Sequence, residues 1–106
     1  MENIFKGILN ALELPIVFVD CFNKITFMNK AAIEHYKDQG GENLVGKSIF
    51  SCHNENSKML ILEGLKQLQR GLDKVLLFEN EEIKEYMLAV RDNSTLLGYF
   101  EIVERK

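Results

Sequence analysis

The segments of this chain that favour β-structure lie at its two ends, and helical segments separate them. Residues 16–20 and 25–28 are rich in β-branched and aromatic side chains, as are residues 75–78, 83–91 and 96–103. Short polar connections join the last three segments. Two runs of strands around a block of helices are typical of an α+β domain. The sequence therefore predicts a five-stranded antiparallel sheet with helices packed on one face.

Apolar spacing and capping residues predict two helices in the first half of the chain. Residues 2–12 read as an amphipathic helix, and Pro15 then prevents the helix from continuing. Asn29 follows the second strand and suits the N-cap of a helix over residues 30–39, because its side chain can accept a hydrogen bond from a free backbone N–H.

The longest helix is predicted over residues 57–70, with Asn56 or Ser57 as its N-cap and Gly71 as its left-handed stop. Gly64 lies inside this helix, where glycine costs about 1 kcal/mol relative to alanine. Tight packing against the sheet explains such a glycine, and so does room for a ligand. Packing is the more common reason.

Length and composition favour one cytoplasmic domain over residues 1–106, with a helix over 1–12 and a core over 13–106. Charged residues are 27% of the chain and the net charge is -3, without a basic stripe that would indicate nucleic-acid binding. No apolar run is long enough to span a membrane. Two cysteines, Cys21 and Cys52, define no disulfide framework and favour a reducing compartment.

Both faces of the predicted sheet carry apolar side chains. Ile16 and Phe18 alternate with Val17 and Val19 in the first strand, and the last strand has a similar pattern. The central helices can cover only one face, so the other face needs the N-terminal helix, a second copy of the chain, or both. A homodimer is therefore expected.

Several stretches together resemble a PAS domain, or sensory box. They are Leu-Pro-Ile-Val-Phe-Val-Asp at 14–20, Lys-Ile-Thr-Phe-Met-Asn-Lys-Ala-Ala at 24–32, Leu-Val-Gly-Lys-Ser at 44–48, and Leu-Gly-Tyr-Phe-Glu-Ile-Val at 97–103. The similarity extends over residues 12–104. It implies a sheet around a small-molecule pocket roofed by helices, frequent dimerisation, and a signalling role coupled to an effector domain or protein.

A narrower pattern is similar to a PAS subgroup that occurs with hemerythrin-like domains. It consists of Cys52-His53 followed by Ser57, and of Ala-Val-Arg-Asp at 89–92. The subgroup usually has Pro-Pro-Lys between the His and the Ser, whereas this chain has Asn-Glu-Asn at 54–56.

The resemblance places a ligand pocket between the sheet and the long helix 57–70. Apolar side chains expected to line it are Ile61, Leu65, Phe78, Leu88 and Phe100. His53 precedes the helix, and some PAS domains bind haem through a histidine near this point. The alternative for His53 is a hydrogen bond to loop backbone that orders the turn.

Arg91 could clamp a carboxylate ligand, because a guanidinium forms two parallel hydrogen bonds with that group. Its alternative is an ion pair with Asp92, Asp20 or another surface acid.

Catalysis and a metal site have little support in the sequence. Cys52 and His53 are chain neighbours without an evident orienting third group, and the cysteines and histidines match no common zinc spacing. The Ser-Cys-His-Asn sequence at 51–54 lacks the Arg-Phe continuation of flavin-binding light sensors, so flavin is not expected. Three functions remain: a ligand-binding sensory domain that signals through dimer or partner contacts, a dimerisation module without ligand, and a haem-based gas or redox sensor.

Overall fold

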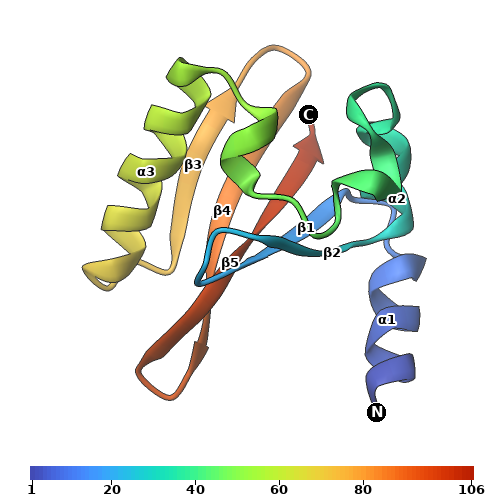
Figure 1. Ribbon diagram of the computed structural model, residues 1–106, viewed down its shortest axis with the longest axis horizontal. Coiled ribbons are helices and arrows are strands. Elements are labelled where there is room, and N and C mark those ends of the chain that lie inside the picture. The colour runs from blue at the N-terminus through green and yellow to red at the C-terminus, as the bar shows by residue number, and fades with distance from the viewer.

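A computed structural model describes residues 1–106, apart from the side chain of Cys52. Five strands form one antiparallel sheet in the order β2-β1-β5-β4-β3 (Figure 1). They are β1 (Ile16–Asp20), β2 (Ile25–Met28), β3 (Lys74–Glu79), β4 (Ile83–Asp92) and β5 (Thr95–Arg105). The first strand, β1, pairs along its whole length with residues 98–102 of the last strand, β5. This pairing confirms the predicted α+β architecture, in which the two ends of the chain join in one sheet.

The helical segments come before and between the two runs of strands. They are α1 (Glu2–Ala11), α2 (Lys30–His35), α3 (Glu55–Gln69), and the short 3-10 helices η1 (Lys37–Gln39), η2 (Gly41–Leu44) and η3 (Ile49–Cys52). The helix predicted over 30–39 is thus divided, because α2 ends at His35 and η1 follows. The prediction for the start of α3 was wrong: Asn54 is the N-cap, and its side chain accepts a hydrogen bond from the Ser57 N–H.

Strand alternation gives the sheet an inner face, covered by helical segments, and an outer face. The inner face carries most of the buried core, with Val19, Met87 and Tyr99 fully buried. Helix α3 packs directly on this face, since a Cβ added at Gly64 would lie 3.0 Å from the Met87 sulfur and 3.2 Å from a Leu77 methyl carbon. This contact favours the packing explanation for Gly64.

The fully buried side chain of Asn29 joins α1, β1 and α2. Its Oδ1 accepts hydrogen bonds from the backbone N–H groups of Ile16 and Ala32, both at 2.9 Å. Its Nδ2 donates to the backbone carbonyls of Leu9 and Leu14, also at 2.9 Å. The predicted N-cap is confirmed, and the same amide also orders the segment that enters the sheet.

Replacing Asn29 with alanine is expected to lower the free energy of unfolding by about 2–3 kcal/mol, because four backbone groups lose their partner and some stay buried. Urea denaturation would measure this loss. The control is Asn10→Ala, which removes one exposed hydrogen bond from the Lys30 N–H at the same junction. Equal losses in the two variants would contradict the role assigned to Asn29.

Helix α1 extends away from the sheet beside α2 (Figure 1). None of its residues is buried, and its apolar side chains Ile4, Phe5 and Ile8 are all more than half exposed. It therefore leaves the outer face uncovered. That face carries the half-buried Phe18, Leu88, Phe100 and Ile102 and the more exposed Leu76. In the described part of the chain, no helix combines the length and the hydropathy that a membrane span requires.

Candidate functional site

A cavity of about 210 Å³ lies between the inner face of the sheet and the segment that runs from α2 to η3. Its walls are mostly apolar, from Val17, Ile25, Met28, Leu44 and Ile49. Four side chains with polar groups also line it, namely Tyr36, Gln39, His53 and Glu101. An apolar cavity with a few convergent polar groups is the usual form of a small-molecule site, although this one is below the typical range of roughly 300–1,000 Å³.

Glu101 is the most unusual of these side chains. It lies in the middle of β5, next to Val17 of β1 and Met87 of β4, and is only 5% exposed. Its Oε2 has no hydrogen-bond partner among the described residues. Burial raises the pKa of Glu101 to about 8, and repulsion by the carboxylate of Glu85 adds to the rise. The side chain is therefore mostly protonated at neutral pH.

Glu85 places a second carboxyl group on the same face. It lies on β4 opposite Val103, which is two residues beyond Glu101 on β5, so the two glutamates are diagonal neighbours. Burial raises the pKa of Glu85, whereas a long hydrogen bond donated by the Tyr36 hydroxyl (3.4 Å) lowers it, as do His53 and His35. The inner face thus holds two acids near the cavity.

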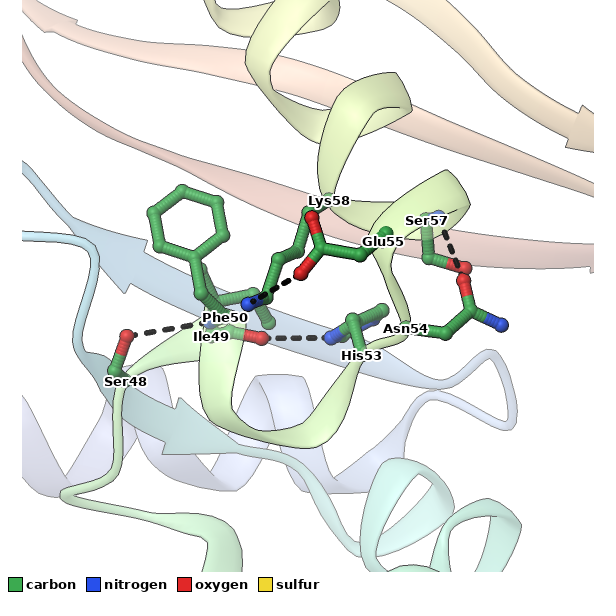
Figure 2. A network of polar contacts seen from close by, with 8 residues as sticks. All are labelled: Ser48, Ile49, Phe50, His53, Asn54, Glu55, Ser57 and Lys58. Atoms are coloured by element: carbon green, nitrogen blue, oxygen red, sulfur yellow. Dashed lines mark hydrogen bonds and ion pairs between the residues drawn. The ribbon is translucent and has the colours of Figure 1, made fainter.

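His53 lies between η3 and α3 in a network of local hydrogen bonds (Figure 2). Its Nδ1 donates to the backbone carbonyl of Ile49 at 2.6 Å, since a carbonyl oxygen can only accept. Ser48 and Asn54 cap the two flanking helices by accepting from the N–H groups of Phe50 and Ser57. This network holds the imidazole at the wall of the cavity.

Arg91 lies on β4, and its side chain caps the C-terminal end of α3. One guanidinium nitrogen donates to the backbone carbonyls of Leu68 and Leu72 at 2.8 and 3.0 Å, and Nε forms an ion pair with Asp73 at 3.5 Å. A cation at the end of a helix is favoured by the partial negative charge of the last carbonyls. Arg91 lines neither the 210 Å³ cavity nor a smaller cavity of about 90 Å³ under α3.

No protein-family model matches the chain, and no curated protein sequence matches it. Solved structures do match. The C-terminal domain of a Streptococcus mutans protein superimposes with a TM-score of 0.81 at 25% identity, covering 98% of this chain and 84% of that one. A PAS domain from Colwellia psychrerythraea gives a TM-score of 0.74 at 14% identity, covering 99% of this chain and 96% of that one.

The PAS domain of nitrogen regulation protein NR(II) from Vibrio parahaemolyticus gives a TM-score of 0.65 at 16% identity, with coverage of 97% and 98%. This chain has the PAS fold. The comparisons do not bear on the narrower similarity to the subgroup found with hemerythrin-like domains, which stays a prediction.

The PAS fold brings together only part of the predicted site. His53, Ile61 and Phe78 line the smaller cavity, of about 90 Å³, between α3 and the sheet. Leu65 packs against the core. Leu88 and Phe100 pair with each other on the outer face and line neither cavity. The pocket was predicted beside α3. The larger cavity instead lies under α2, η2 and η3.

The structure supports the alternative interpretation of His53, in which the side chain binds loop backbone. It also gives Arg91 an ion pair, although the acid is Asp73 and not one of the two named from the sequence. The prediction for Cys52 concerns a side chain outside the described residues. Among the described residues, no group of three or more His, Cys, Asp or Glu side chains could hold a metal ion.

Glu101 was missed in the sequence, although a signal was present. It is the one charged residue in an otherwise apolar run, Leu-Leu-Gly-Tyr-Phe-Glu-Ile-Val, at residues 96–103. A carboxyl group at the centre of a strand with apolar neighbours on both sides is rarely buried without a function or a partner.

Proposed function

We propose that this chain is a sensory, signal-transducing domain that binds a small molecule in the cavity between α2, η3 and the inner face of the sheet. It relays the bound state through contacts with a second copy or another partner. The observation that carries the proposal is the cavity itself, with apolar walls and the buried, incompletely hydrogen-bonded Glu101. The fold shared with the PAS domain of a regulatory protein adds support. The cytoplasmic location expected from the cysteine content remains part of the proposal.

A fragment screen followed by methyl NMR tests this function. Ligands are expected to shift the methyl signals of Ile25, Met28 and Leu44, which line the cavity, and not that of Ile102 on the outer face. Gln39 lines the cavity but is exposed, so it lies at the opening. The Gln39→Trp variant is expected to weaken binding at least tenfold by blocking entry. A screen in which no compound perturbs the cavity methyls would contradict the proposal.

The haem alternative has weaker support. The cavity beside His53 is smaller than the range for drug-sized ligands, and a porphyrin is larger than most of these. The buried carboxyl group of Glu101 also lies in its wall, where a haem would need apolar surface. These residues do not fit a haem without rearrangement of α2 and η3.

A dimerisation role is the second candidate, and the exposed apolar surface favours it. Helix α1 has one strongly apolar side, and the outer face of the sheet is uncovered. Exposed apolar surface of this kind often marks an interaction site. A second copy of the chain would cover both surfaces at once.

Light scattering at several protein concentrations would measure the dimer. The wild-type chain is expected to be dimeric at micromolar concentration, and the double variant Ile4→Ser/Ile8→Ser is expected to weaken association by at least about tenfold, because it removes most of the apolar side of α1. The control is Lys6→Ser on the same helix. A wild-type chain that is monomeric throughout would exclude this role.

A further inference from the structure

The charged groups in and near the cavity indicate which class of ligand it binds. Oε2 of Glu101 is buried in its wall and has no hydrogen-bond partner among the described residues. Among the residues whose side chains the structure describes, neither Lys nor Arg lines the cavity. Glu85 adds a second carboxyl group close by on the same face of the sheet. A buried carboxyl group without a partner is unfavourable, so a ligand that supplies one gains binding energy.

We propose that the cavity binds a small molecule with a positively charged nitrogen, and that Glu101 is the residue that pairs with this charge. The inference rests on the proposed ligand-binding function and adds the chemical class of the ligand. The ammonium group lies against Oε2 of Glu101, and a short apolar portion lies against Met28, Leu44 and Ile49.

An anionic ligand fits this cavity poorly, because the carboxyl group of Glu101 lines it, that of Glu85 lies nearby on the same face of the sheet, and no Lys or Arg among the described residues lines it. A neutral ligand could donate one hydrogen bond to Glu101, but a charged donor to a carboxylate forms a bond about twice as strong. The apolar surroundings strengthen the attraction further, since the effective dielectric constant is below that of water. The volume of about 210 Å³ restricts the ligand to one smaller than a typical drug-sized molecule.

Binding of a cation is coupled to loss of the Glu101 proton. Because burial raises the pKa of Glu101 to about 8, the carboxyl group must lose its proton to pair with the ligand below that pH. Other titratable groups near this region are Glu85 on β4, His35 at the end of α2, Tyr36 directly after it, His53 before α3, and Tyr99 on β5. Cation affinity is therefore expected to rise by up to about tenfold per pH unit between pH 6 and 8.

Three four-carbon probes of equal length test the charge preference, namely n-butylammonium, 1-butanol and butyrate. Affinity is measured from the methyl signals of Met28 and Leu44 at pH 8 and again at pH 6. The expected result is that n-butylammonium binds at least about tenfold more tightly than the other two at pH 8. Glu101→Gln is expected to remove this advantage and its pH dependence. Glu104→Gln, on the same strand but on the outer face, is the control and should change neither.

Equal or tighter binding of 1-butanol or butyrate would overturn the charge assignment and leave the proposed ligand-binding function standing. An unchanged affinity in Glu101→Gln would overturn the role of Glu101. If no probe binds, the inference fails, and the fragment screen then decides separately whether the cavity binds other ligands. If Glu101→Gln does not fold, the pH dependence in the wild-type chain gives the decision: an affinity that is flat between pH 6 and 8 contradicts the proposal.

Discussion

The free energy of unfolding of the Glu101→Gln variant is expected to exceed that of the wild-type chain by about 4 kcal/mol at pH 8, and to be within about 1 kcal/mol of it at pH 5. The reason is the burial that raises the pKa of Glu101 from its ordinary value of 4.5 to about 8. Glutamine has nearly the same shape and no charge, so the variant avoids the free-energy cost of burying an ionised group.

The direction of the effect follows from proton binding in the two states. Between pH 4.5 and 8 the unfolded chain loses the Glu101 proton while the folded chain keeps it, so the folded state binds more protons. The contribution of Glu101 to the free energy of unfolding is therefore fully present below pH 4.5. It falls by up to about 1.4 kcal/mol per pH unit as the pH rises toward 8. Above pH 8 both states are ionised and the loss stops growing.

Urea denaturation at pH 5, 6, 7 and 8, at one protein concentration, measures the effect. Fixing the concentration matters because association would also change the apparent stability. Glu104→Gln is the control, since it removes a carboxylate from the same strand on the opposite face of the sheet. A difference between wild type and Glu101→Gln that is the same at pH 5 and pH 8 would show that Glu101 titrates normally in the folded chain.

Gly98→Ala is expected to destabilise the fold by about 4 kcal/mol or more, which places it among the most damaging single substitutions. Gly98 has a φ of +155° and lies on β5 opposite Asp20 of the neighbouring strand β1. A Cβ at this position would lie only 2.3 Å from the backbone oxygen of Val19 and 3.0 Å from the Cα of Asp20. Backbone atoms cannot move aside as a flexible side chain can, so the two central strands would have to separate.

Thermal unfolding measures this effect as a drop of roughly 15 °C or more, given about 4–8 °C per kcal/mol for a domain of this size. The matched control is Gly46→Ala. Gly46 also has a positive φ, of +94°, but an added Cβ would have nothing within 4 Å. The control thus reports backbone strain alone, expected at about 1–2 kcal/mol. Similar losses in the two variants would show that the close approach of the strands does not matter.

Signals within a few residues of one another predicted the fold well. Pro15 before the first strand, Asn29 as an N-cap and Gly71 after the long helix all have the roles expected from the sequence. Each depends on local backbone chemistry and not on the rest of the molecule. The error at the start of α3 has the same local origin, because Asn54 and Asn56 are both good N-cap residues and only the folded loop selects between them.

The site was predicted less well because strand alternation does not say which face is covered. The alternation itself was correct in β5, but both of its faces are apolar, so Phe100 was expected in the pocket although it lies outside. Moving the inner face by one residue exchanges every side chain between the two surfaces. Glu101 was then the wrong kind of residue for an apolar slot, although it is the group that gives the cavity its chemistry.

Strand β5 lies at the centre of the sheet, between β1 and β4. Glu101 faces the cavity, while its chain neighbours Phe100 and Ile102 face the opposite surface. One peptide unit on either side thus separates the buried carboxyl group that lines the cavity from side chains on the outer face of the sheet. If a change in the ionisation of Glu101 alters the twist or tilt of this strand, the adjacent side chains on the outer face move with it.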